Sequence, residues 1–245
     1  CRVTGDRGVL DEKLAFIEGP PLAEGQHDAF FKPGRAAEEA PLYDHCARAL
    51  DLALQRTGEN GLPLILGGDW NDGMNRVGKA GRGTSVWLGW FLAGTLRGFA
   101  AIARERGDHG RADRWENHPA RLKDALETAG WDGSYYRRGY YDDGTPLGSA
   151  TSAECRIDSI AQSWSVLSGE GDADRSRQAM DAVMAELVDR ENGIIRLFTP
   201  LLAETPQDPG YIKAYPPGVR ENGGQYTHAA TWVVLALARQ GRGDD

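Results

Sequence analysis

The chain has 245 residues, of which 40% are hydrophobic and 26% are charged, a composition typical of a globular protein with a sizeable core rather than of a disordered segment. Its net charge is −8 and its pI is about 5.2, and its basic residues form no cluster beyond short pairs such as Arg137-Arg138. These features argue against nucleic acid as a partner.

The chain carries no recognisable targeting or cross-linking signal. Its three cysteines, Cys1, Cys46 and Cys155, are odd in number and lack the C-x-x-C spacing of metal or redox sites, so we expect no metal and a reduced, cytoplasmic setting. No apolar run reaches the roughly 18 residues of a membrane span, so we expect no membrane contact by this segment. Because the chain begins without Met, we expect it to be a piece of a longer polypeptide, which could itself be membrane-embedded.

Two helices are expected in the first half of the chain. Residues 1–35 are rich in Gly, Pro and charge and predict an extended or looped entry. A helix is expected from about Ala36 to Arg56, because its apolar residues fall on one stripe. Thr84 or Ser85 is the expected cap of a second helix through about Arg106, whose aromatic and aliphatic body indicates burial on more than one side.

A charged helix is expected from about Pro119 to Ala129, followed by an aromatic block from Trp131 to Tyr141. We interpret this block as a β-hairpin, with its turn at the acidic, glycine-containing run 142–144. Arg137 lies among its tyrosines. The sequence leaves open whether Arg137 binds a phosphate or sugar oxygen or is a structural residue stacked between aromatic rings.

Three further helices are expected in the second half. The first is capped by Thr151 or Ser152, and on it Glu154, Asp158 and Gln162 would share one face, either in a polar cleft or in solvent. The others run from Asp172 to Asp189 and from about Gly224 to Gln240. The sequence therefore predicts an all-α fold of about six helices joined by long loops, and loops of this length indicate that they build a site.

The run Gly67–Asn75 (GGDWNDGMN) is the strongest candidate for that site. A sugar ring has an apolar face for stacking and a rim of hydroxyls, so Trp70 suits a sugar platform while Asp69 and Asn71 suit hydrogen bonding to hydroxyls. Asp72 is then free for proton transfer. Asp and Asn beside Gly are also ordinary turn residues, so a plain loop stays open as an alternative. An EF-hand calcium loop fails on spacing, because Gly73 and Ala80 occupy ligand positions.

Three blocks of the chain, at 68–91, 131–149 and 215–228, resemble glycoside hydrolase family 94 in the same order. Within that family the chain is most similar to the phosphorylase-like C-terminal region of cyclic β-1,2-glucan synthases. The resemblance covers essentially the whole chain. It implies that residues 1–245 are a fragment of a single catalytic domain built as an (α/α)6 toroid, of which six helices would be about half.

The resemblance also implies roles for individual residues. It makes Asp72 the general acid and places Asp69 and Trp70 in the donor-sugar subsite beside it. The acceptor side corresponds to three residues of the 215–228 block: Tyr215, Arg220 and Glu221. Arg220 stands where some relatives carry Lys, which leaves the choice of acceptor open. His228 matches the phosphate-binding histidine, and a position near a helix N-terminus suits an anion ligand.

The expected reaction is inverting phosphorolysis of a β-linked glucan, with β-1,2 the linkage that the resemblance implies, giving α-glucose 1-phosphate. Inorganic phosphate is the co-substrate and no cofactor is expected. Phosphate brings its own negative charge, so one carboxylic acid suffices, whereas a hydrolase needs two carboxylates. Two alternatives stay open: an inverting hydrolase that uses Asp72 with Glu154, and a non-catalytic glucan-binding part of a larger synthase.

Overall fold

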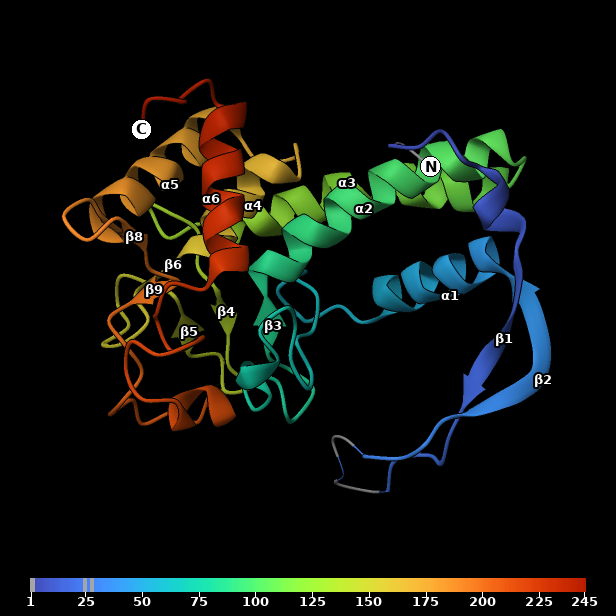
Figure 1. Cartoon of the computed structure of the whole chain (residues 1–245), viewed down its shortest axis with the longest axis horizontal. Coiled ribbons are helices and arrows are strands. Elements are labelled where there is room, and N and C mark those ends of the chain that lie inside the picture. The colour runs from blue at the N-terminus through green and yellow to red at the C-terminus, as the bar shows by residue number, and fades with distance from the viewer. Residues whose placement is uncertain (1–2, 24–25, 27–28) are drawn as a thin grey trace. The chain divides into compact units, whose positions relative to one another are not determined.

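The computed structural model describes residues 3–23, 26 and 29–245, so the interpretation of Cys1 lies outside the described residues (Figure 1). The chain divides into two compact units, Cys1–Arg56 and Thr57–Asp245. The second unit contains all residues predicted to form the site, and each unit is described by itself.

The first unit is a two-stranded sheet with one helix. Strands β1 (Lys13–Glu18) and β2 (Gly34–Pro41) pair antiparallel, a short 3-10 helix η1 (Gly8–Asp11) precedes them, and helix α1 (Leu42–Gln55) follows. The predicted loop therefore contains strands, and the predicted helix start at residue 36 is wrong. Pro41 explains the difference, because a residue that precedes proline disfavours helical backbone, and Pro41 itself is extended at the N-cap.

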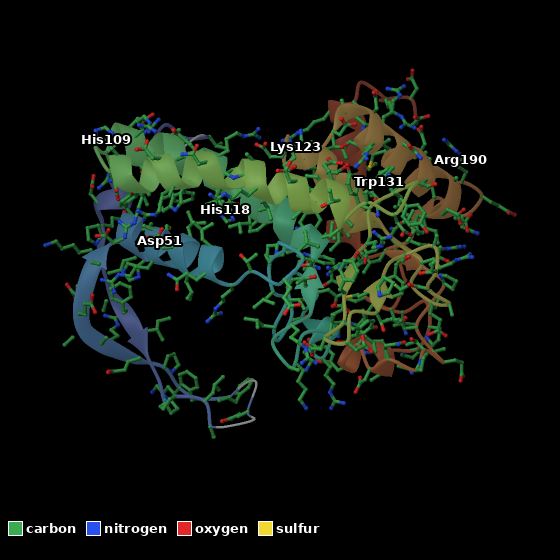
Figure 2. All side chains as sticks on the ribbon, turned by 180° about the vertical axis from the view of Figure 1, so that it is seen from behind. Asp51, His109, His118, Lys123, Trp131 and Arg190 are labelled. Atoms are coloured by element: carbon green, nitrogen blue, oxygen red, sulfur yellow. The ribbon has the colours of Figure 1, made fainter. Side chains whose placement is uncertain are left out.

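Helices α2 (Val86–Glu105) and α3 (His109–Thr128) lie side by side in the second unit (Figure 1). Ser85 caps α2 as predicted, since its hydroxyl accepts a hydrogen bond from the Leu88 N–H at 3.0 Å. In Figure 2, His109, His118 and Lys123 follow α3, and Trp131 lies just beyond its end. Helix α3 begins ten residues before the predicted start at 119, because Asp108 caps it and the helix accommodates a proline in its interior.

Helix α2 is the one described helix that is long and apolar enough to cross a membrane by length and composition alone. Half of its apolar window is buried inside the protein, and core helices pass the same test. The helix packs along α3 and against α4, which accounts for that burial and for the predicted burial on more than one side.

Helices α4 (Ser159–Leu167), α5 (Ala173–Glu186) and α6 (Thr227–Arg239) pack against one another. The predicted start of α4 at 151 or 152 is wrong, because the residues just before Ser159 are extended and pair with another strand. The N–H groups of Cys155 and Arg156 donate to the carbonyls of Pro200 and Thr199, both at 2.7 Å. The helical face predicted for residues 154, 158 and 162 therefore does not exist.

Short antiparallel strands join the helices of the second unit. Strands β3 (Thr84–Ser85), β4 (Gly139–Tyr140) and β5 (Pro146–Leu147) form one sheet, β6 (Ile157–Asp158) pairs with β9 (Phe198–Thr199), and β7 (Val188–Asp189) pairs with β8 (Ile194–Ile195). The predicted hairpin is confirmed as β4–β5.

The predicted six helices are confirmed in the described part of the chain, but the prediction of an all-α fold needs correction, since four small sheets accompany them. The strands are two residues long in the second unit, too short for a pattern of alternating polarity to reveal them. Strands β3 and β6 run directly into α2 and α4, so they set where the N-termini of these helices lie.

Candidate active site

The loop from Gly67 to Asn75 is folded tightly on itself. It is closed at its base by the Ile65 N–H, which donates to the Gly83 carbonyl at 2.9 Å. Gly68 has a φ of +127°, and a Cβ there would lie 3.2 Å from the Asp72 Cα. This position therefore requires glycine, both for its backbone angle and for the close approach. The loop ends in a short 3-10 helix, η2 (Asp72–Met74).

Asp69 is buried and its carboxylate is fully engaged. The Arg138 guanidinium donates to both carboxylate oxygens, at 2.7 and 2.6 Å, and neither side chain is exposed to solvent. The Ser85 hydroxyl donates to the same carboxylate at 2.6 Å, and the Asn71 N–H donates to it at 3.0 Å. The structure therefore shows Asp69 as the residue that holds the loop in place, with no carboxylate edge open to solvent.

Arg138 extends this network to Asp158, the N-cap residue of α4. Its Nε lies 3.3 Å from the Asp158 Oδ2, while the Asp158 Oδ1 accepts a hydrogen bond from the Ile160 N–H at 2.9 Å. Burial raises the pKa of Asp158 to about 6, against the opposing effect of Arg138. Burial disfavours the charge on Arg138, but the Asp69 and Asp158 carboxylates outweigh it and raise the Arg138 pKa. One buried ionic network thus connects the loop to the N-termini of α2 and α4.

Asp72 lies in the opposite environment, exposed at the start of η2. Its neighbour is Tyr211, on the 3-10 helix η3 (Tyr211–Ala214). Burial, followed by a hydrogen bond to Asp72 and its negative charge, raises the pKa of Tyr211 to about 12, with smaller effects of Tyr215 and Glu221. The Tyr211 hydroxyl therefore stays protonated and can donate to the Asp72 carboxylate.

Backbone and side-chain contacts hold the segments around η2 and η3 together. The Tyr211 N–H donates to the Asn75 Oδ1 at 3.2 Å, the Arg76 N–H donates to the Pro209 carbonyl at 3.2 Å, and the Arg76 side chain pairs with Asp208. These contacts hold residues 208–211, which lie just before the predicted acceptor-side residue Tyr215, against the end of the Gly67–Asn75 loop.

The three predicted acceptor-side residues lie together beyond η3. The Arg220 guanidinium stands 4.7 Å above the Tyr215 ring, and its Nε lies 3.3 Å from the Glu221 Oε2. Arg220 has a φ of +51°, which is unusual for a residue other than glycine. Asn222 supports this turn, because its amide donates to the carbonyls of Leu202 and Tyr215 at 2.8 and 2.9 Å.

Trp70 and His228, predicted separately for sugar and for phosphate, are in direct contact. The Trp70 Nε1–H donates to the His228 Nδ1 at 3.1 Å. The Trp70 ring also contacts Tyr226 and Trp232, with ring centroids 5.3 Å apart in each case. His228 is exposed in the first turn of α6, where helical N–H groups and the helix dipole favour an anion.

Asn71 is only 2% exposed, and neither its amide nitrogen nor its amide oxygen has a hydrogen-bond partner within the described part of the chain. An unpaired buried amide costs free energy. This cost would be offset if a ligand bound beside Asp72 and formed hydrogen bonds with the Asn71 amide.

Two other candidates are engaged elsewhere. Arg137 donates to the Ala129 and Trp131 carbonyls and pairs with Asp132, which supports its structural alternative. Glu154 accepts hydrogen bonds from the N–H groups of residues 203–205, at 2.8 to 2.9 Å. These bonds outweigh the effect of burial and lower the pKa of Glu154.

Sequence reasoning missed Arg138, Ser85 as a partner of Asp69, and Tyr211. The sequence shows Arg138 as one member of the Arg137-Arg138 pair. Adjacent side chains on extended backbone point in opposite directions, so only one of the two arginines can face the Gly67–Asn75 loop. The pair alone does not indicate which one. Tyr211 directly follows an Asp-Pro-Gly turn and lies four residues before Tyr215. This position is only a weak sequence signal for a residue of the site. Among the described residues no group of three or more His, Cys, Asp or Glu side chains is arranged to hold a metal ion.

The loop that carries the exposed Asp72 thus also carries Trp70, whose indole contacts His228, on a mainly helical scaffold. The chain belongs to the Glycosyl hydrolase 94 superfamily, catalytic domain, whose family model matches residues 11–245.

Named relatives are similar over nearly the whole chain but are much longer. The chain is 73% identical over 245 residues to the cyclic beta-(1,2)-glucan synthase NdvB of Rhizobium meliloti (strain 1021), covering all of this chain and 9% of the synthase. It is 35% identical to the solabiose phosphorylase of Paenibacillus borealis, covering 99% of this chain and 29% of that enzyme.

A solved structure, the GH78 family rhamnosidase of Bacillus sp. GL1, matches with a TM-score of 0.54 and 16% identity, over 82% of this chain and 17% of that one. At this identity the match shows a shared fold alone.

Proposed function

We propose that the chain is a β-1,2-glucan phosphorylase-type domain of a glucan synthase, which transfers glucosyl units by inverting phosphorolysis through α-glucose 1-phosphate. One observation carries the proposal: the loop with the exposed Asp72 also carries Trp70, whose indole is hydrogen-bonded to the exposed His228. A candidate acid, sugar platform and phosphate ligand therefore meet at one loop. The names of the relatives, a cyclic beta-(1,2)-glucan synthase and a solabiose phosphorylase, support a glucan and phosphate as the substrates.

In the proposed reaction Asp72 protonates the glycosidic oxygen as the bond to the anomeric carbon breaks. Phosphate attacks that carbon from the opposite face, so the configuration inverts and α-glucose 1-phosphate forms. Trp70 stacks on the donor sugar and the Asn71 amide pairs with its hydroxyls. Phosphate is the co-substrate, and the reaction needs no cofactor because acid catalysis and a charged nucleophile suffice.

The acceptor sugar is proposed to bind at Tyr215, Arg220 and Glu221. Tyr215 and Glu221 act on Tyr211, as Asp72 does, and Arg220 contacts both Tyr215 and Glu221. This supports an acceptor site next to the proposed acid. Asp69, although predicted to bind the donor sugar, is assigned an indirect part, because Arg138 and Ser85 occupy its carboxylate.

The hydrolase alternative requires a second carboxylate that activates water. Glu154 was its candidate, but three backbone N–H groups occupy its oxygens in this structure. This favours phosphorolysis. The non-catalytic alternative stays open, because an exposed carboxylate such as that of Asp72 can also accept hydrogen bonds from sugar hydroxyls.

We further propose that the chain is part of an (α/α)6 toroid whose other helices belong to a longer protein, and that this segment lies on the cytoplasmic side without contacting the membrane or nucleic acid. The glucan synthase and the solabiose phosphorylase are several times longer than the chain, which supports a longer protein.

The proposal is tested by incubating the complete protein that carries this chain with a linear β-1,2-glucan, with and without inorganic phosphate. We expect α-glucose 1-phosphate to appear only with phosphate. Release of free glucose at the same rate without phosphate would establish hydrolysis, and saturable glucan binding without either product would establish the non-catalytic alternative. Asp72→Asn serves as the matched inactive control.

A further inference from the structure

The hydrogen bond between Trp70 and His228 has a fixed direction. An indole nitrogen can only donate, so the His228 Nδ1 at 3.1 Å must be the acceptor and cannot carry a proton while the bond exists. In a neutral imidazole the hydrogen then resides on Nε2. The Trp70 indole thus selects one of the two tautomers of His228.

The packing around His228 also limits the orientation of its ring. Trp232, one turn further along α6, lies 4.3 Å from the His228 ring centroid, and the Trp70 centroid lies 5.6 Å away on another side. The side chain is nonetheless exposed, and within the described part of the chain no hydrogen bond to Nε2 occurs. Nε2–H is therefore a fixed donor open to solvent.

We propose that Trp70 is a positioning residue for His228: its indole N–H holds the imidazole in the Nε2–H tautomer, so that Nε2–H donates to a phosphate oxygen. This inference rests on the proposed function, since it assigns the phosphate ligand of that reaction to one atom. It gives Trp70 a second task, distinct from sugar stacking, that depends on the indole nitrogen and not on the ring face.

The hydrogen bond is tested first in the 245-residue chain by ¹⁵N NMR of the histidine side chains, at a pH where the ring is neutral. We expect the His228 Nδ1 to be unprotonated and to shift toward the value of a free imidazole acceptor in Trp70→Phe, which keeps an aromatic ring but has no N–H. Trp232→Phe is the matched control, because it trims a neighbouring indole that makes no hydrogen bond to His228, and it should leave Nδ1 nearly unchanged. A proton on Nδ1 in the wild-type chain, or equal shifts in the two variants, would overturn the proposal.

The choice of Nε2 is tested in the complete protein with two substitutions of His228. Glutamine places its amide nitrogen near the position of Nε2, whereas asparagine places its amide near Nδ1, facing Trp70. We expect His228→Gln to raise the KM for phosphate only a few-fold. His228→Asn should raise this KM by roughly tenfold, because a hydrogen bond to the charged phosphate is lost. Trp70→Phe should raise it by roughly fivefold, because the lost hydrogen bond joins two neutral groups.

The two tests separate the failure of this inference from the failure of the proposed function. If cleavage by the wild-type protein does not depend on phosphate, the proposed function fails, and the role of Nε2 as a phosphate donor is overturned with it. If cleavage depends on phosphate but Asn serves at residue 228 as well as Gln, only the present inference is overturned.

Discussion

Asp69 and Asp72 are three residues apart, yet the structure gives them opposite environments. The side chain of Asp69 is buried, and both of its carboxylate oxygens accept hydrogen bonds from Arg138. Asp72 is exposed and has the Tyr211 hydroxyl beside it. Of these two carboxylates only that of Asp72 is exposed, which supports the proposal that the second acid of the loop is the general acid.

We expect Asp72→Asn to reduce cleavage of an unactivated β-1,2-glucan by about 10²- to 10⁴-fold, since it keeps shape but supplies no proton. Phosphorolysis of β-glucosyl fluoride, whose leaving group needs little protonation, should fall far less. Both rates are measured in the complete protein. Asp69→Asn is the comparison: it breaks the pair with Arg138 and should affect both substrates alike. A selective loss in Asp69→Asn alone would move the acid to that residue.

Removing the imidazole at residue 228 should separate the two substrates of the proposed reaction. We expect His228→Ala to raise the KM for phosphate more than the KM for glucan, because the ring is a proposed ligand of phosphate and contacts the sugar site only through Trp70. Initial rates over a grid of both substrates measure the two constants. Equal increases in the KM for phosphate and the KM for glucan would contradict the assignment of His228 as a phosphate ligand.

At the scale of elements, the buried network of Arg138 joins the Gly67–Asn75 loop to β4 and to the N-termini of α2 and α4. We expect Arg138→Met to lower the free energy of unfolding of the chain by about 3–5 kcal/mol, because it leaves Asp69 buried without its cation. Arg104→Met removes two ion pairs, with Asp113 and Glu116, whose side chains are exposed, and should cost far less. Urea denaturation of both variants measures the difference, and similar losses would contradict a special role of the buried pair.

The N-cap of α4 should make stability depend on pH. Burial raises the pKa of Asp158 from 3.8 to about 6 in the folded protein, so its favourable contribution is complete below pH 3.8 and is lost as the pH rises through about 6. Asp158→Asn keeps an oxygen acceptor for the Ile160 N–H but cannot ionise. The unfolding free energy of the wild type should therefore fall relative to that of Asp158→Asn between pH 4 and 7. A constant difference over this range would contradict the shift.

The helices and the hairpin could be predicted from the sequence, because apolar periodicity and caps such as Ser85 are local signals. Three helix starts were wrong: α1 begins only after Pro41, α4 begins only after residues that pair with a distant strand, and α3 is capped by Asp108 well before Pro119, where its start was predicted. The 155–156 segment is extended because it pairs with residues 199–200, which local patterns do not reveal. For the site, the loop residues were visible, but the choice of Arg138 over Arg137 as the partner of Asp69 depends on tertiary packing.

At the scale of the whole molecule, the length of the chain bears on what it can do alone. It covers 9% of the glucan synthase and 29% of the solabiose phosphorylase to which it is similar. Phosphate carries between one and two negative charges near neutral pH, whereas the proposed site has one donor at His228 and the chain carries a net charge of −8. Long-range repulsion therefore opposes binding unless cationic groups from further chain surround the anion.

We accordingly expect the purified 245-residue chain to show little or no phosphorolysis of β-1,2-glucan, because the proposed toroid and phosphate site are incomplete in it. Formation of α-glucose 1-phosphate is measured for the chain and for the complete protein at equal concentration. Circular dichroism and a cooperative urea transition of the chain serve as the control, so that inactivity cannot be ascribed to unfolding. Turnover by the chain at a rate close to that of the complete protein would show that residues 1–245 already contain every group the reaction needs.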